Sequence, residues 1–120
     1  TFGAVEPNTA YAPASGNTDA SYVIRVEQAT NVIIDLFQKG LDLASTSDVI
    51  GIGNMSSATV NATLNATPLQ KFYNSTNPTA KALTPGSNAT AYYWINIPNP
   101  RAGNYNSTIS IKAVETGAAP

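Results

Sequence analysis

Residues 89–97 read ATAYYWINI, and this stretch of the 120-residue chain decides the fold class. Its side chains alternate between two faces with a period of two, which is typical of a β-strand. One face carries Ala91, Tyr93, Ile95 and Ile97. Residues 106–114 (NSTISIKAV) repeat the alternation after a connection rich in Pro and Gly at 98–104. Their inward face is predicted to carry Ile109, Ile111 and Ala113. Two strands joined by a loop therefore form the end of the chain.

The same alternation recurs in shorter stretches toward the N-terminus. Strands are predicted at residues 21–27, 32–36, 48–53, 58–66 and 69–73, and residues 35–47 are interpreted as strand, loop and short strand. Seven or eight short β segments, roughly ten residues apart, are typical of an antiparallel sandwich. We therefore predict an all-β domain over residues 21–120.

Residues 1–20 (TFGAVEPNTAYAPASGNTDA) differ from this body in having few apolar positions and several Pro and Gly residues. We interpret them as an extended N-terminal arm. One hypothesis is strand addition, in which the arm completes an open sheet edge of the next molecule. The candidate donor-strand residues, which would fill pockets there, are Phe2, Ala4, Val5 and Tyr11. The alternative is a frayed terminus.

The composition excludes several classes of function. Six Lys and Arg residues against seven Asp and Glu residues, with a pI near 5.0, leave no basic surface for nucleic acid. The chain contains no Cys and no His, which removes disulfides, thiol nucleophiles, His bases and ordinary zinc sites. Asp35, Asp42 and Asp48 show no spacing that predicts a catalytic carboxylate pair. We expect neither an enzyme nor a cofactor.

The chain begins at Thr1 rather than Met, and we interpret it as a processed product or a fragment. Its longest apolar runs, such as residues 32–34, are far shorter than the roughly 20 residues of a membrane helix. We expect an extracellular chain whose mature form does not insert into a membrane.

Asn-x-Ser/Thr sequons, the acceptors for N-glycosylation, are the strongest chemical motif. Six occur, whereas the composition alone would give about two or three. They are centred on Asn54, Asn61, Asn65, Asn74, Asn88 and Asn106. The strand pattern places Asn61, Asn65 and Asn106 outward with their hydroxyl partners, where a glycan fits. The alternative is chance in a chain rich in Asn and Thr. We favour covalent N-linked glycans.

Aromatic residues suggest two further roles. Tyr92 and Trp94 share the outer face of their predicted strand, where they could form a sugar-binding platform. The alternative is that this face is covered, by a neighbouring chain or by a glycan. Tyr105 follows Gly103 and Asn104 at the start of the last strand and is similar to the tyrosine corner of sandwich folds.

The closing run of residues 92–114 (YYWINIPNPRAGNYNSTISIKAV), together with the polar arm, the Cys-free β domain and the clustered sequons, resembles the secreted sandwich pilins of archaea that form thread filaments. This resemblance implies an immunoglobulin-like sandwich with an extended N-terminal donor strand. It also implies a head-to-tail filament, in which the donor strand of one subunit completes the incomplete sheet of the next. Bacterial chaperone–usher pilins are similar in plan, but they usually carry a disulfide that this chain lacks.

We therefore expect a structural subunit of a cell-surface filament whose partners are identical subunits, with other filaments or cell surfaces as further candidates. Adhesion, biofilm formation and cell–cell contact all remain open as its use. Two alternatives stand beside this hypothesis. One is a carbohydrate-binding or adhesin module that uses Tyr92 and Trp94, and the other is a domain of a surface-layer protein.

Overall fold

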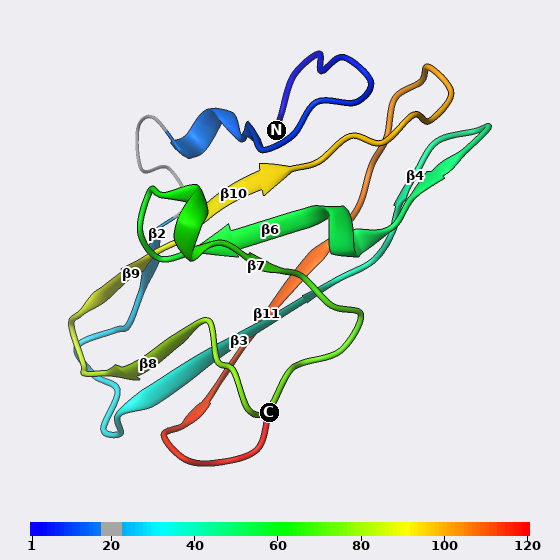
Figure 1. Cartoon of the computed structure of the whole chain (residues 1–120). Coiled ribbons are helices and arrows are strands. Elements are labelled where there is room, and N and C mark those ends of the chain that lie inside the picture. Colours follow the sequence, from blue (N-terminus) through cyan, green and yellow to red (C-terminus); the bar gives the residue numbers. More distant parts are fainter. Residues whose placement is uncertain (18–22) are drawn as a thin grey trace.

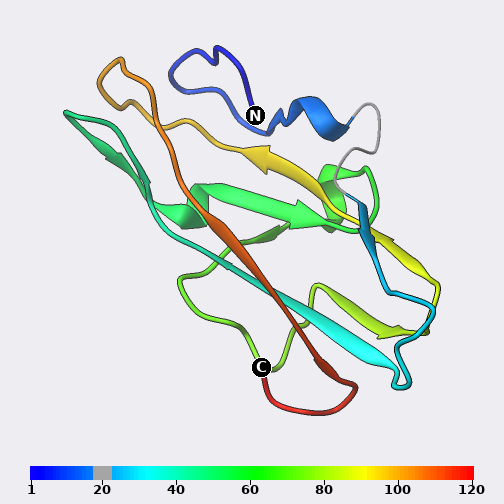
Figure 2. The ribbon, with the colours of Figure 1, turned by 180° about the vertical axis from the view of Figure 1, so that it is seen from behind.

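The computed structural model describes residues 1–17 and 23–120 (Figure 1). The regular elements of this part are β-strands and three short 3₁₀ turns, and every pairing between strands is antiparallel. The principal dimensions are 48 × 28 × 24 Å. The two termini lie on opposite sides of the molecule in both views (Figures 1 and 2). The predicted all-β fold is thus confirmed.

The strands form two larger sheets and two short ladders. The first sheet has the order β1 (Ala12–Pro13), β10 (Tyr92–Ile95), β6 (Met55–Ala58) and β7 (Thr67–Pro68). The second has the order β11 (Ile109–Glu115), β3 (Ile34–Gly40) and β8 (Ala80–Leu83). The ladders pair β2 (Val23–Arg25) with β9 (Asn88–Thr90), and β4 (Leu43–Ala44) with β5 (Val49–Ile50).

The two larger sheets run obliquely to one another (Figures 1 and 2). A polar bridge joins them, because Gln38 of β3 accepts a hydrogen bond from the Tyr93 hydroxyl at 3.0 Å and donates one to the Ser57 hydroxyl. Buried polar groups of this kind need partners to offset the loss of water. Gln38 therefore fixes how β3 lies relative to β6 and β10.

A cluster of buried apolar residues lies beside this bridge. It consists of Ala12, Ala14, Leu43, Ile50, Ile52, Met55, Leu69, Ala91, Tyr93 and Ile95. Two of them, Ala12 and Ala14, belong to the first 17 residues. Phe2 and Val5 also pack against the cluster, each half-buried. The start of the chain is therefore part of the core of this single molecule.

The strand predictions succeed best at the C-terminal end. β10 and β11 lie within or overlap the predicted stretches, and β2, β3 and β5 overlap theirs. The inward face predicted for residues 106–114 is wrong for two of its three residues, because Ile111 (46% exposed) and Ala113 are exposed on an edge strand and only Ile109 is half-buried. Edge strands have a neighbour on one side only, so less of their surface is covered.

The strand predicted at residues 58–66 is wrong. β6 ends at Ala58, and the chain then passes through a 3₁₀ turn at Thr63–Asn65. Val60 and Leu64, which would form the apolar face of that strand, are 57% and 95% exposed. The predicted strand at residues 69–73 is also absent, since only Thr67–Pro68 pairs with β6. Residues 80–83, which form β8, were not predicted because their sequence, AKAL, shows little alternation.

Candidate functional site

The first 17 residues, here called the N-terminal segment, lie along the free edge of β10. The Ala14 amide donates to the Tyr93 carbonyl at 2.9 Å, and the Ile97 amide donates to the Thr9 carbonyl at 2.8 Å. β1 continues this pairing with Ala12 opposite Ile95. Within the single chain, the segment is thus an edge strand of its own sheet and does not stand apart from residues 21–120, as the predicted arm does. Residues 18–20 of that arm lie outside the described residues.

A groove of about 980 Å³ lies under the start of the segment, between residues 1–7 and the loop at 100–106. Apolar side chains line its inner wall, namely Leu43, Ile50, Ile95 and Ile97. We call it the N-terminal groove. Phe2 and Val5 of the segment are half-buried against the adjoining core. The segment therefore forms one wall of this groove, opposite the apolar side chains, and supplies backbone pairing beside it.

The four candidate donor-strand residues divide into two pairs. Phe2 and Val5 contact the core, whereas Ala4 and Tyr11 are exposed and fill no pocket within the single chain. Tyr11 has a φ of 51°, in the left-handed region that a bulky residue rarely adopts. The buried apolar residues of the segment that were missed are Ala12 and Ala14. Their small side chains gave no apolar signal in the sequence.

Asn17 holds the end of the segment against β10. Its side chain is buried, donates from Nδ2 to the Tyr93 carbonyl at 2.8 Å, and accepts from the Tyr93 amide at Oδ1 at 2.9 Å. The amide thereby imitates the backbone of a neighbouring strand. Asn61 adds a third contact, because its Nδ2 donates to the Asn17 carbonyl at 2.9 Å. No sequence motif marked Asn17 for this role.

A loop at residues 98–104 closes one side of the N-terminal groove. The Tyr105 hydroxyl donates to the Arg101 carbonyl at 2.5 Å, four residues upstream, which is the contact of a tyrosine corner. The Arg101 amide donates to Asp48 at 2.9 Å and thereby ties the loop to the β4–β5 hairpin. This bond and that from the Val49 amide hold the pKa of Asp48 below its usual value.

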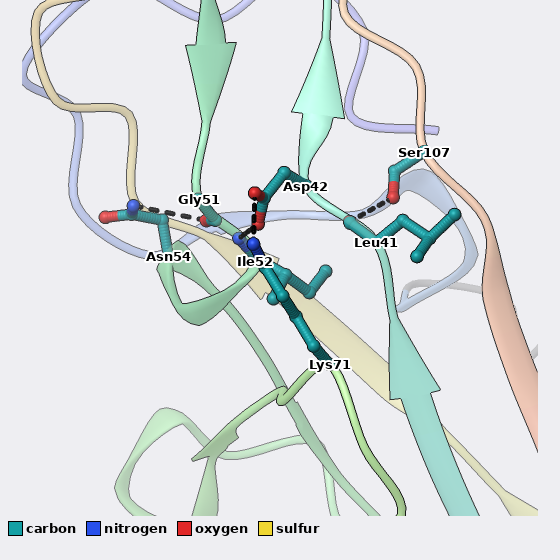
Figure 3. A network of polar contacts seen from close by, with 7 residues as sticks. All are labelled: Leu41, Asp42, Gly51, Ile52, Asn54, Lys71 and Ser107. Atoms are coloured by element: carbon teal, nitrogen blue, oxygen red, sulfur yellow. Dashed lines mark hydrogen bonds and ion pairs between the residues drawn. The ribbon is translucent and has the colours of Figure 1, made fainter.

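Asp42 ties the other side of the hairpin to the segment that follows β7 (Figure 3). Its carboxylate pairs with Lys71 at 2.6 Å and accepts from the Ile52 amide at 2.9 Å. The Lys71 hydrogen bond is the main cause that lowers the pKa of Asp42. Nearby, the Ser107 hydroxyl donates to the Leu41 carbonyl (Figure 3). These contacts serve the fold, because each carboxylate oxygen is directed to a backbone or lysine donor of a loop.

Asp35 behaves in the same way on the second sheet. It is buried and accepts hydrogen bonds from the Ala82 amide at 2.8 Å, the Thr116 hydroxyl at 3.0 Å and the Gly117 amide at 3.2 Å. The bond from Ala82 is the main cause that lowers its pKa. Ala82 has a φ of 52°, so Asp35 holds an unusual backbone conformation in β8.

Four of the six sequons lie open at the surface. Asn65, Asn88 and Asn106 are exposed, and Asn74 is half-buried. Their hydroxyl partners, Thr67, Thr90, Thr108 and Thr76, are exposed or half-buried. A glycan on any of these four would extend from the folded chain without displacing the core.

The remaining two sequons are partly engaged by the fold. Ser56, the hydroxyl partner of Asn54, is only 6% exposed within β6, and Asn54 itself donates to the Gly51 carbonyl (Figure 3). Asn61 is exposed as a residue, but its Nδ2, the atom that would carry a glycan, donates to the Asn17 carbonyl. In these two sequons the hydroxyl partner or the attachment atom is engaged by the fold, which the sequence alone does not reveal.

Asn74 has a distinct local geometry. Its Oδ1 accepts from the amide of Thr76 at 3.0 Å and from the Thr76 hydroxyl at 2.7 Å, forming an Asx turn. The amide carbonyl and the hydroxyl of this sequon are thus already in contact. Among the residues described, Asn74 is the one sequon asparagine whose side chain contacts its own hydroxyl partner.

A second cavity, of about 550 Å³, lies between β6, β7 and the loop at residues 74–79. We call it the polar cleft. It is lined by Gln38, Gly53, Ser57, Ala58, Thr59, Asn65, Thr67, Pro68, Leu69, Gln70, Asn74, Asn77, Pro78 and Thr79. This lining contains amides and hydroxyls and no charged side chain. Two sequon asparagines, Asn65 and Asn74, belong to it.

The aromatic platform is not available in the folded chain. Trp94 is only 3% exposed, while Tyr92 is half-buried and stacks with it at 6.5 Å between ring centroids. A sugar needs an open aromatic face, and Trp94 offers none. The alternative in which this face is covered agrees with the structure, although the covering lies within the chain.

Over residues 1–17 and 23–120, no cluster of three or more acidic residues is arranged to hold a metal ion. Helices of the length and apolarity needed to cross a membrane are absent from the same residues. No family model, no curated protein and no solved structure matches this chain.

Proposed function

We propose that this chain is a structural subunit of an extracellular, archaeal-type filament. In this proposal the body is an immunoglobulin-like sandwich, and the N-terminal segment of each subunit pairs with the β10 edge of the next subunit and forms one wall of its N-terminal groove. The observation that carries the proposal is the pairing of the segment with the β10 edge, together with the packing of Phe2 and Val5 against the core. In this proposal the segment is the donor strand and the β10 edge is its acceptor site.

The position of the segment in the fold favours exchange. Its strand β1 lies at the edge of the sheet, so the order β10-β6-β7 continues without it. An element of this kind can pair with its own body or with an identical body, and the contacts are the same in both cases. In this proposal the contact between the segment and β10 is the same in the closed single chain, where it forms within one molecule, and in the filament, where it forms between two molecules.

The contacts of the segment stabilise whichever body it pairs with. Each hydrogen bond between the segment and residues 93–98 contributes about 0.5–1.5 kcal/mol. Full burial of a Val or Phe side chain adds about 1.5–3 kcal/mol, so the half-buried Val5 and Phe2 add less.

The sequons support an extracellular place for such a filament. Exposed acceptors such as Asn88 and Asn106 would carry glycans outward from the subunit surface. The surface carries few charges, so hydroxyl and amide groups would provide most of its contact with water. The expected partners are identical subunits, and the fibre surface would meet other filaments or cell surfaces.

The absence of Cys allows a direct test of exchange. Chains with Ala12→Cys alone are mixed, after unfolding and refolding together, with chains carrying Ile95→Cys alone. These residues are register partners, so their β-carbons lie within reach of a disulfide. Exchange predicts a disulfide-linked pair of one chain of each kind, seen by non-reducing electrophoresis and confirmed by peptide mass.

The control places both substitutions in one chain at high dilution. If the segment pairs with its own body, the two introduced cysteines form an intramolecular disulfide, which confirms that they lie close enough to bond. If the double variant bonds within itself while the mixed single variants yield no mixed dimer at any concentration, the segment stays on its own body and the filament proposal is wrong.

A further inference from the structure

The polar cleft has the composition of a site for a neutral, hydroxyl-rich ligand. Its lining offers side-chain amides from Asn65, Gln70 and Asn77, and hydroxyls from Thr67 and Thr79. None of these five side chains donates or accepts a hydrogen bond within the described residues. They are free to pair with a ligand, and the volume of about 550 Å³ is in the range of small-molecule sites.

The chemistry of the lining narrows the ligand class. Phosphate, carboxylate and metal ligands are bound mainly by charged side chains, and the polar cleft has none. Sugars present neutral hydroxyl groups that both donate and accept, which is what amide side chains match. Pro68, which is exposed, adds apolar surface for the carbon face of a sugar ring.

One sugar source is tethered at the cleft itself. Asn74 lies in the lining, and its Asx turn occupies Oδ1 with two bonds from Thr76. Its Nδ2, where a glycan is attached, donates no hydrogen bond within the described residues. Because Asn74 is a lining residue of the cleft, a sugar linked to it is held beside the cleft at high effective concentration.

We infer that the polar cleft holds the first sugars of an N-linked glycan attached to Asn74. This inference rests on the N-glycosylation in the proposed function and goes further, because it assigns one glycan a structural place on the protein. The glycan would cover Gln70 and Asn77 and join β7 to the loop at residues 74–79. Glycans on Asn88 and Asn106 would extend freely.

The exposed ring of Phe72 is an alternative surface on which the same glycan could pack. It lies two residues before Asn74, is 59% exposed and does not belong to the cleft lining. Aromatic faces attract sugar rings, so the two places must be separated by experiment. The cleft is favoured because it offers several amide partners, whereas the ring offers none.

The test compares amide hydrogen exchange in the purified glycoprotein and its variants. Peptide mass spectrometry first establishes which sequons are occupied. Relative to Asn74→Gln, the glycosylated wild type should exchange about threefold or more slowly at residues 65–70 and 77–79, because a bound glycan suppresses local opening. Asn88→Gln is the matched control and should exchange like the wild type at these positions.

Two further variants separate the cleft from the ring. The double substitution Gln70→Ala and Asn77→Ala should remove the protection, while Phe72→Ala should leave it. Equal exchange in the wild type and Asn74→Gln, or protection lost only in Phe72→Ala, overturns the inference. So does an unmodified Asn74 beside occupied sequons elsewhere, whereas a chain without any glycan overturns the glycosylation in the proposed function.

Discussion

Asn17 is the residue on which the docked N-terminal segment depends most for its polar contacts. Replacing it by Ala removes both side-chain bonds to the Tyr93 backbone, and the lost bonds are buried. We expect the free energy of unfolding of the monomer to fall by about 1–3 kcal/mol. Urea titration followed by Trp94 fluorescence measures this change.

The control for Asn17→Ala is Asn99→Ala, because Asn99 is exposed. Its free energy of unfolding should change by less than about 0.5 kcal/mol. Equal effects of the two substitutions would show that the buried amide of Asn17 does not hold the segment.

Three aspartates determine the pH dependence of stability. Asp35, Asp42 and Asp48 all have pKa values below the usual one in the folded chain. A lowered folded pKa means that the stabilisation is complete above the unfolded pKa, near 4, and is lost as the pH falls through the folded pKa. Since the chain has no His, stability should be nearly constant from pH 8 to about 5 and should decrease below pH 4.

Thermal unfolding across this pH range measures the effect. Asp35→Asn should flatten the acid part of the curve, because that position then no longer titrates. A steep change in the melting temperature between pH 6 and pH 8 would contradict this account.

Sequon occupancy should follow exposure if glycans are added to the folded chain. Asn88 and Asn106 should then be modified more fully than Asn54, whose partner Ser56 is buried, and than Asn61, whose Nδ2 bonds the N-terminal segment. Site-resolved peptide mass spectrometry measures the four occupancies. Full modification of Asn54 would show that transfer precedes folding of β6.

At the scale of elements, the N-terminal segment is the part whose role separates a filament subunit from a plain monomer. A chain that lacks residues 1–14 should lose the cover over the β10 edge and the N-terminal groove. We expect a lower melting temperature and no polymer. A synthetic peptide of residues 1–17, added in trans, should restore the melting temperature, because it supplies the same strand.

The matched control is the same peptide with Ala12→Lys and Ala14→Lys. Both positions are buried in the closed chain, so the charged side chains cannot enter the core. Equal stabilisation by the two peptides, or by neither, would contradict a specific acceptor site on the body.

Sequence alone predicted the elements that are richest in strand-forming residues. Residues 92–95 (YYWI) are aromatic and β-branched, residues 109–113 (ISIKA) alternate apolar and polar side chains, and both stretches form strands. Residues 58–66 alternate equally well, but no strand is placed to pair with them and they turn instead. Periodicity reports what a segment can do, while the availability of a partner strand is a property of the whole fold.

The candidate site was predictable only in part, for related reasons. Tyr105 was found because a local spacing sets its contact with Arg101. The burial of Trp94 and the roles of Asn17 and Gln38 depend on contacts between residues far apart in the sequence. Ala12 and Ala14 are small, so no pattern distinguished them from exposed alanines.

At the scale of the whole molecule, the account makes one claim about connectivity. The closed chain satisfies its β10 edge with its own N-terminal segment, and a monomer that remains closed is the competing account. The N-terminal segment and the β10 edge lie side by side (Figure 1), so pairing with a second molecule requires the segment to leave its own body first. The assembled state distinguishes the two accounts most directly.

The most direct measurement is a cryo-electron microscopy reconstruction of the assembled material at a resolution that traces the main chain. The account predicts a fibre in which residues 8–14 pair with residues 93–98 of the neighbouring subunit. Particles that remain single, or a fibre in which each segment pairs with the β10 strand of its own chain, would contradict it.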